Sequence, residues 1–111
     1  MSVEGIILGC GSSSGVPRVG LDGPDWGACD PADPRNRRTR CSILVKAGGV
    51  NVLIDTSPNL REQLLSAGTG RIDAVLYTHD HADQIHGIDD LRAIAYAARR
   101  RMPVYADGAT L

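Results

Sequence analysis

The sequence has no phenylalanine, one tryptophan and three tyrosines, so aromatic residues make up only 4% of its 111 residues. A hydrophobic core must therefore come from valine, isoleucine, leucine and alanine, and such a core is thin for this length. The three cysteines, Cys10, Cys29 and Cys41, are odd in number and contain no CxxC pair. This pattern argues against a disulfide framework and against a zinc site made only of cysteines, and it predicts free thiols.

The chain also lacks an excess of charge and a long hydrophobic run. Twelve basic and thirteen acidic residues leave a net charge of −1, which gives no general attraction to nucleic acid or to an anionic membrane. No apolar stretch approaches the ~20 residues of a membrane span. Residues 1–8 carry Glu4 and no basic residue, unlike a signal peptide. We therefore expect a cytoplasmic protein without a membrane partner.

The hydrophobic pattern predicts strands and helices within one domain, which spans residues 1–111. The predicted strands cover residues 3–8, 41–47, 50–55, 73–77 and 102–106. The predicted helices cover residues 58–67 and 88–101. Gly48 and Gly49 predict a tight hairpin turn, because both central residues of such a turn need a positive φ. Ser57 and Gly68 are the expected ends of the first helix, and a long loop is expected up to about residue 40.

All three histidines, His79, His81 and His86, fall within eight consecutive residues, together with Asp83. Neutral imidazoles and a carboxylate are ligands that suit zinc, manganese or iron. The segment follows a predicted strand, and the i, i+2 step from His79 to His81 lets both rings face one ion. The alternative is a polar loop with solvated histidines, which is less favoured because chance seldom gathers every histidine of a chain.

This cluster does not by itself complete a hydrolytic site. A catalytic zinc ion usually takes three protein ligands and keeps one position for water. The sequence has no further histidine, and Asp55 is the only additional carboxylate at the end of a predicted strand. Either the site is weak or the rest of the protein completes it.

The same residues resemble a known family. Asp55 at a strand end, the segment THDHAD at residues 78–83, and then a glycine and a helix are similar to the metallo-β-lactamase fold superfamily, whose second motif reads HxHxDH. Three further segments resemble the branch of phosphoribosyl cyclic phosphodiesterase and ribonuclease Z: residues 8–17, 26–42 and 53–58. The resemblance implies an α/β fold with four αββα layers. This chain would supply the N-terminal βα half of one domain that is truncated at its C-terminus.

The resemblance also implies a metal-dependent hydrolase. The branch that these segments resemble implies a phosphodiesterase that cleaves a small cyclic phosphate or nucleotide through a metal-bound hydroxide, with two divalent ions, zinc or manganese. Because the family's other ligands belong to its second half, we expect little hydrolysis by the 111-residue chain alone. The alternatives are a thioester or lactam hydrolase with the same metal loop, and a non-catalytic metal-binding or partner-binding half-domain.

Four residues take their expected roles from the resemblance. His79 and His81 are the implied ligands of the first metal. Asp83 is the implied ligand of the second metal and takes part in catalysis. Asp55 is expected to order the ligand loop through hydrogen bonds rather than to bind metal.

The motif departs from the family at Gln84, where the family has histidine. Glutamine is a poor zinc ligand, so we expect Gln84 to lie beside the ligands. The second ion would then be held weakly, differ in identity, or be bound through His86. His86 is equally well interpreted as a residue that caps a helix or supports a ligand.

Arginines in the long loop give the candidate substrate-binding residues, Arg37 and Arg38, because a guanidinium matches the geometry of a phosphate. Ion pairs with Asp30 and Asp33, or a solvated loop edge, explain the arginines of this loop about as well. The implied partner is a small phosphodiester substrate, and RNA is less favoured. An uncovered apolar sheet face would favour association, including a homodimer. The glycines of residues 9–15 are expected to let the chain approach the metal loop closely.

Overall fold

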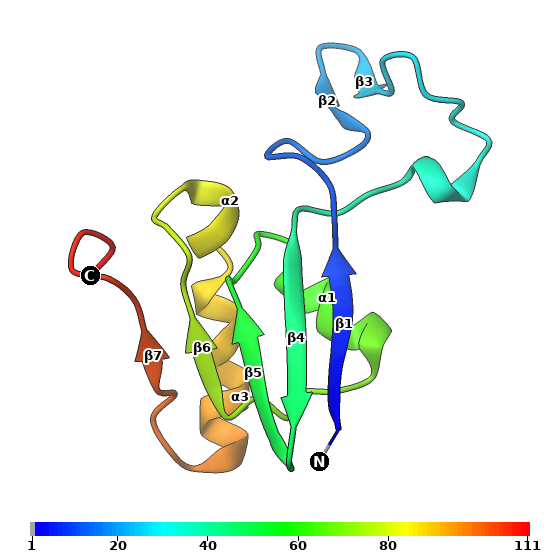
Figure 1. The fold of residues 1–111 in the computed structure, drawn as a ribbon. Helices are drawn as coiled ribbons and strands as arrows, with labels where there is room; N and C mark the ends of the chain where they lie inside the picture. The colour runs from blue at the N-terminus through cyan, green and yellow to red at the C-terminus, as the bar shows by residue number, and fades with distance from the viewer. Residues whose placement is uncertain (1) are drawn as a thin grey trace.

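A five-stranded sheet forms the centre of the fold in the computed structural model, which describes residues 2–111 (Figure 1). The strands follow the order β1 (Val3–Gly9), β4 (Ser42–Ala47), β5 (Val50–Ile54), β6 (Ala74–Leu76) and β7 (Val104–Tyr105). Strand β4 is antiparallel to its neighbours β1 and β5, and β5, β6 and β7 run parallel to one another. The five predicted strands are therefore confirmed.

Two helices cover one face of this sheet (Figure 1). Among the described residues the helices are α1 (Leu60–Ala67), α2 (Ala82–Ile85) and α3 (Leu91–Ala98). The 3₁₀ turn η2 (Ile88–Asp90) joins α2 to α3, and a second 3₁₀ turn, η1 (Pro34–Asn36), lies in the long loop before β4. The longer helices, α1 and α3, pack on the face of the sheet, whereas the single turn of α2 lies beyond the ends of the strands. None of the helices among residues 2–111 is long and apolar enough to cross a membrane.

Strand alternation sorts the apolar side chains into two rows. One row crosses the sheet through cross-strand partners on the helical face: Ile6, Leu44, Leu53, Val75 and Val104. Leu44, Leu53 and Val75 are fully buried and join leucines from the helices in the core. The core is thus purely aliphatic apart from Tyr77, as the lack of phenylalanine predicts.

The second row lies on the opposite face of the sheet, which no helix covers (Figure 1). Its members are also cross-strand partners: Ile7, Ile43, Ile54, Leu76 and Tyr105. Ile7 is 70% exposed and Tyr105 is 61% exposed. The structure therefore contains the uncovered apolar face that the sequence led us to expect, and we call these five residues the open row.

The first helix begins two residues later than predicted, at Leu60 instead of Pro58. Ser57 does not cap it in the expected way. The Ser57 hydroxyl accepts a hydrogen bond from the Asn59 backbone N–H and donates one to Gln63 Oε1, which ties the preceding loop to the helix. The predicted end is confirmed, because Gly68 adopts a left-handed φ of 72° after the last helical residue.

The second helix is shorter than the predicted range of residues 88–101. Its first turn is the 3₁₀ turn η2, and α3 ends at Ala98 because Arg99 adopts a left-handed φ of 54°. Arg100 then turns back toward the sheet, and its Nη2 atom donates to the backbone oxygens of Ile72 and Asp73. Arg100 therefore ties the end of α3 to the segment that leads into β6.

The long loop contains structure that the sequence pattern did not indicate. A small hairpin of β2 (Arg18–Gly20) and β3 (Gly23–Asp25) projects from it, followed by η1. Gly9 packs so closely on the backbone oxygen of Arg40 that a Cβ atom would overlap it. The expected close approach of this glycine segment to the metal loop is therefore wrong, because its glycines approach residues 38–40 instead.

Tyr77 and Thr56 join the ends of β6 and β5 inside the protein. The Tyr77 hydroxyl lies 2.7 Å from the Thr56 hydroxyl, which donates to the backbone oxygen of Ile85 at 3.1 Å. The Thr56 backbone N–H donates to the Gln84 backbone oxygen at 2.7 Å. These bonds fasten α2 and the preceding loop to the sheet.

We predict that Tyr77→Phe lowers the free energy of unfolding by about 1 kcal/mol, because it removes one buried hydrogen bond. Burial raises the pKa of the Tyr77 phenol, and the nearby Asp55 charge adds to the effect while the Thr56 bond opposes it. An unfolded tyrosine ionises at pH ~10. The stability that the native fold gains from keeping the Tyr77 phenol neutral is therefore fully present below that pH and is lost as the pH rises through the folded-state pKa. Urea unfolding at neutral and at alkaline pH measures both effects.

The control is Tyr96→Phe, because Tyr96 is 70% exposed. It should leave stability and its alkaline loss unchanged. An alkaline loss of the same size in the Tyr77→Phe protein would contradict the assignment to Tyr77.

We also predict that the open row drives self-association of the purified chain, including any homodimer. Ile7→Lys should reduce association at a given concentration, because it places a charge on the exposed apolar face. Leu65→Lys is the matched control, since Leu65 is 65% exposed but lies on α1, on the other side of the molecule. Sedimentation velocity would show the difference, and an equal effect of the two variants would refute this role for the open row.

Candidate metal centre

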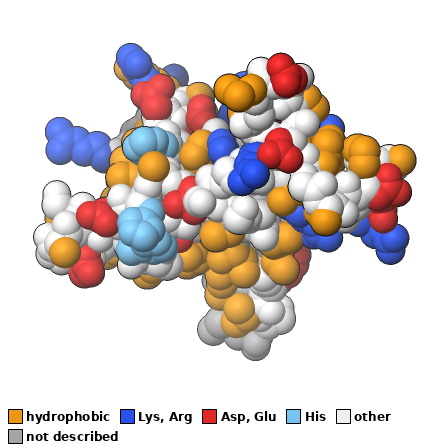
Figure 2. Space-filling view, turned by 90° about the horizontal axis from the view of Figure 1, so that it is seen from above, with side chains coloured by type: hydrophobic (Ala, Val, Ile, Leu, Met, Phe, Trp, Pro, Cys, Tyr) orange, Lys and Arg blue, Asp and Glu red, His pale blue; other side chains and the backbone are white. Residues whose placement is uncertain are grey.

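The histidine loop, residues 78–81, connects the C-terminal end of β6 to α2. Thr78 and His79 directly follow Tyr77, and His81 is the last residue before α2. Both histidines are exposed, and histidine side chains are visible on the surface when the molecule is seen from above (Figure 2). The long loop that carries the arginines begins at the C-terminal end of β1, on the same side of the sheet as the end of β6 (Figure 1).

The structure brings His79 and His81 together. Their ring centroids lie 4.5 Å apart, with an angle of 77° between the ring planes. The His81 side chain makes no capping hydrogen bond to α2, so its ring nitrogens are not used by the helix. Two adjacent imidazoles on an exposed loop can donate to one ion from the same side.

Asp55 supports this loop from inside the protein. It follows β5, is 6% exposed and adopts a left-handed φ of 63°. Its Oδ1 atom accepts the Thr78 backbone N–H at 2.8 Å, and its Oδ2 atom accepts the Thr78 hydroxyl at 2.8 Å. The Thr78 hydroxyl oxygen also lies 2.8 Å from His79 Nδ1. The carboxylate therefore contacts the residue beside the histidine rather than the outer surface of the loop.

The other predicted site residues occupy α2 and its end. Asp83 is half-buried in the first turn of α2, and its Oδ2 atom accepts a hydrogen bond from Gln84 Nε2 at 3.1 Å. Gln84 is 5% exposed. His86 is exposed and ends α2 through its backbone, whose N–H donates to the Ala82 oxygen. The structure thus pairs Asp83 with Gln84 and leaves His86 at the helix end.

The donor atoms fit a divalent metal in type but not in number. Among residues 2–111, no three histidine, cysteine, aspartate or glutamate side chains lie close enough to hold an ion. The buried Gln84 Oε1 atom has no hydrogen-bond partner among these residues, and an amide oxygen suits a hard cation such as Mn²⁺ better than Zn²⁺. The described residues therefore bring two imidazoles together, fewer than the three protein ligands of a usual catalytic zinc site.

The two candidate substrate-binding arginines are exposed on the long loop. The Arg37 guanidinium carbon lies 5.2 Å from the centre of the Trp26 ring, and Arg38 Nη1 donates to Cys10 Sγ at 3.1 Å. Arg35 is paired with Asp33 at 2.9 Å, so the ion-pair interpretation is confirmed for that arginine. The predicted free cysteines are also confirmed, because Cys10, Cys29 and Cys41 are all unpaired and exposed among the described residues.

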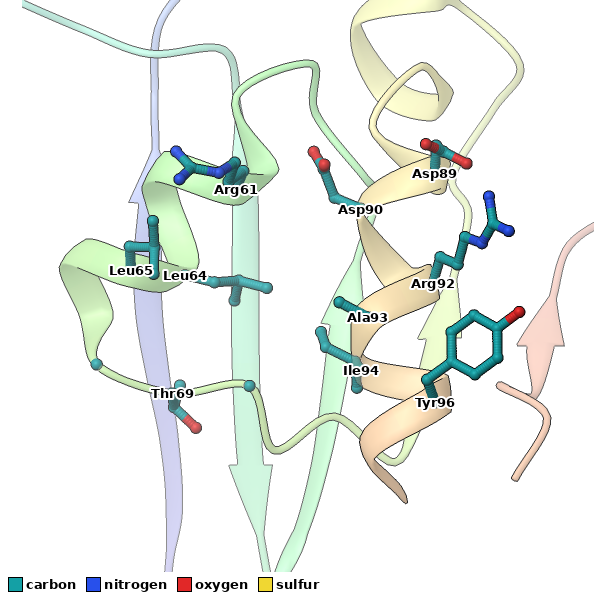
Figure 3. Close-up of a pocket in the computed structure, with 12 residues that line it drawn as sticks. Arg61, Leu64, Leu65, Thr69, Asp89, Asp90, Arg92, Ala93, Ile94 and Tyr96 are labelled. Atoms are coloured by element: carbon teal, nitrogen blue, oxygen red, sulfur yellow. The ribbon is translucent and has the colours of Figure 1, made fainter. Parts of the chain in front are cut away.

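A separate groove of about 800 Å³ lies between α1 and α3 (Figure 3). Its floor contains Leu64 and Ile94, and Arg61 and Asp90 stand at its rim. The described residues that line it include none of the predicted site residues. The volume of this groove therefore gives no support to a site at the histidine loop.

Two residues that position the loop were not assigned a role by the sequence. Thr78 connects Asp55 to His79, and a hydroxyl directly before the first histidine was the only signal for it. Gly87 follows the motif and packs against the Ser57 backbone, where a Cβ atom would overlap the Ser57 oxygen. Only the folded chain reveals that contact, because residues 57 and 87 are distant in sequence.

The sequence has recognisable relatives. Residues 50–111 match the family model described as the Beta-lactamase superfamily domain. The chain is 45% identical over 103 residues to an octanoyltransferase of Porphyromonas gingivalis, which covers 92% of this chain and 20% of that protein. It is 40% identical over 60 residues to a ribonuclease Z of Bradyrhizobium sp. (strain ORS 278), which covers 52% of this chain and 20% of that protein. The chain thus spans about a fifth of the length of these curated relatives.

Solved structures show the same fold. A new diphosphatase from the PhnP family superposes with a TM-score of 0.87 at 43% identity, over 98% of this chain and 43% of that chain. The metallo-β-lactamase fold protein YhfI from Bacillus subtilis shares the fold over 96% of this chain and 37% of its own, with a TM-score of 0.64 at 19% identity. The family model covers more than half of the chain, and the protein therefore belongs to the β-lactamase superfamily, with one sheet and its helices forming one half of the metallo-β-lactamase fold.

Proposed function

We propose that the chain is the metal-binding half of a metal-dependent hydrolase that cleaves a phosphodiester in a small cyclic phosphate or nucleotide. The observation that carries this proposal is the pair of exposed imidazoles, His79 and His81, whose rings lie 4.5 Å apart. A buried carboxylate supports the same loop through Thr78. Exposed histidines without such support would be expected to lie independently in solvent.

The proposed roles follow from donor chemistry and position. His79 and His81 would hold the first ion, and Asp83 would contribute to a second ion and accept a proton in the reaction. A bound divalent ion supplies two kinds of chemistry, a lowered pKa of water and polarisation of a phosphate oxygen. Gln84 would orient Asp83 through the bond to its Oδ2 atom.

The names of two relatives support a phosphorus-containing substrate. The structural neighbour at 43% identity is described as a diphosphatase, and a curated relative is a ribonuclease Z. Arg37 and Arg38 would bind the phosphate. They lie on the long loop, which begins at the same end of the strands as the histidine loop. The rival acyl substrate, a thioester, draws support only from the octanoyltransferase.

A second candidate function is metal binding without catalysis. It is favoured by one observation, the lack of a third close metal-binding side chain among residues 2–111. An ion held by two imidazoles keeps too few protein ligands for a usual catalytic zinc site. In this case the chain would bind metal and turn over no substrate.

We predict that the metal-free chain binds Zn²⁺ or Mn²⁺ and that His79→Ala and His81→Ala each weaken binding by more than about 10-fold. Even groups that only support a metal ligand are worth about 10–100-fold in affinity, and a ligand should be worth at least as much. Isothermal titration calorimetry measures the affinity, and elemental analysis measures the metal content.

Asp80→Asn is the matched control, because Asp80 is an exposed acid between the two histidines. His86→Ala decides the open question of the third histidine, since only a ligand should weaken binding when removed. Equal affinity of the wild-type, His79→Ala and His81→Ala proteins would exclude the loop as the principal site.

We further predict phosphodiester hydrolysis when the chain is joined to the remainder of the fold. In a chimera, residues 2–111 replace the matching part of the PhnP-family diphosphatase, which they superpose over 98% of their length. Bis(p-nitrophenyl) phosphate should be cleaved in the presence of Mn²⁺ or Zn²⁺, and Asp83→Asn should lower kcat by about 100-fold or more. Arg38→Ala should chiefly raise KM, because the arginine would bind ground state and transition state alike.

Arg35→Ala is the control for Arg38→Ala, because Arg35 is occupied by its pair with Asp33. A thioester tested beside the phosphodiester separates the rival substrate. Faster cleavage of the thioester would replace the proposed substrate class, and metal binding without cleavage of either would favour the non-catalytic function.

A further inference from the structure

Three side chains form a hydrogen-bonded line from the interior to the first histidine of the loop. The Thr78 hydroxyl donates to Asp55 Oδ2 at 2.8 Å, and its oxygen lies 2.8 Å from His79 Nδ1. The Thr78 backbone N–H donates to the other carboxylate oxygen, Asp55 Oδ1, at 2.8 Å. One residue therefore uses both oxygens of the carboxylate and also contacts the imidazole.

The number of hydrogens in this line fixes their positions. The Thr78 hydroxyl donates to Asp55 Oδ2, so the single hydrogen of that hydroxyl lies on the bond to Asp55. The hydroxyl oxygen can then only accept from His79. Nδ1 of His79 must carry a hydrogen, and in a neutral imidazole this leaves the lone pair on Nε2.

We infer that Thr78 is a positioning residue that couples Asp55 to His79 and holds His79 in the tautomer whose Nε2 atom can bind a metal ion. The inference rests on the proposed function, since it names the residue that prepares one of the proposed ligands. Metal-binding histidines commonly donate their other ring N–H to an acceptor that fixes the tautomer and strengthens the ligand. Here a hydroxyl is that acceptor, and the carboxylate acts through it.

The inner end of the line is held firmly. Asp55 is 6% exposed, its backbone N–H donates to the Leu76 oxygen at 2.9 Å, and its backbone oxygen accepts the Ser42 hydroxyl at 3.0 Å. The outer end is open, because His79 is exposed. The line therefore connects a fixed carboxylate to a nitrogen that an ion can approach.

An Asp55→Asn variant should reverse the line. Asparagine tolerates the left-handed φ of 63° that Asp55 adopts. The Thr78 backbone N–H requires an acceptor, so the amide oxygen must take the Oδ1 position and the amide N–H₂ group must face the Thr78 hydroxyl. The hydroxyl would then donate to His79 Nδ1, and the ring hydrogen would move to Nε2, where it must be displaced before a metal ion can bind.

The test reads the tautomer directly in the metal-free chain at neutral pH. Long-range ¹H–¹⁵N correlation spectra of the imidazoles distinguish a protonated Nδ1 from a protonated Nε2. Wild-type protein should show His79 with hydrogen on Nδ1, and Thr78→Ser should retain it because the hydroxyl remains. Thr78→Val has nearly the same shape without the hydroxyl and should lose this preference, and Asp55→Asn should show the hydrogen on Nε2.

Zn²⁺ affinity is the second readout. Thr78→Val and Asp55→Asn should bind about 10–100-fold more weakly than wild type, and Thr78→Ser should bind close to wild type. In the imidazole spectra of the metal-free proteins, the exposed His86 is an internal reference whose signals should be the same in the wild type and the three variants. Backbone amide spectra report whether each variant folds, and Thr78→Ser and Asp55→Asn provide separate routes if Thr78→Val does not.

A wild-type His79 with hydrogen on Nε2 would overturn the inference. So would a Thr78→Val protein that matches wild type in both tautomer and affinity. If the Nδ1 hydrogen is present and the variants shift it as expected but wild-type chain fails to bind Zn²⁺, the role of Thr78 is supported and the proposed function is not.

Discussion

The Asp55 carboxylate is the interaction on which the arrangement of the histidine loop depends. Its two oxygens accept both the backbone N–H and the hydroxyl of Thr78, so the first residue of the loop is fixed in position and in orientation. A buried carboxylate is costly unless it is hydrogen-bonded, and at Asp55 these bonds compensate that cost. The hydrogen bonds that satisfy the Asp55 carboxylate therefore also fix the position of His79 and, through Thr78, the ring nitrogen that faces solvent.

A second attachment holds the other end of the loop. The Thr56 backbone N–H donates to the Gln84 oxygen at 2.7 Å, and the Gly87 N–H donates to the Thr56 oxygen at 3.0 Å. His79 and His81 lie between these two attachments, on a segment too short to move far from either. Two adjacent residues at the end of β5, Asp55 and Thr56, thus set the position of both imidazoles, which explains how exposed side chains can be ordered.

The strands and the place of the histidines could be predicted because each depends on local pattern. Runs such as residues 50–54 are apolar except for Asn51 and are bounded by turn residues, and the histidines follow a strand directly. The hairpin of β2 and β3 has strands of three residues, which are too short to show alternation. The role of Thr78 and the contact of Gly87 with Ser57 depend on chain segments that meet only in the folded protein, so no local pattern indicates them.

Two residues of the open row stand close in sequence to the residues that hold the histidine loop. Ile54 of the open row directly precedes Asp55, and Leu76 lies two residues before Thr78. Any surface that covers Ile54 and Leu76 therefore comes within reach of the histidine pair and can add the ligands that residues 2–111 do not bring together. Covering the apolar face and binding an ion would then stabilise each other, because whatever favours one bound state favours the other by the same free energy. Under the proposed function, metal binding would accordingly depend on two facing surfaces, of which this chain would supply the one that carries the imidazole pair.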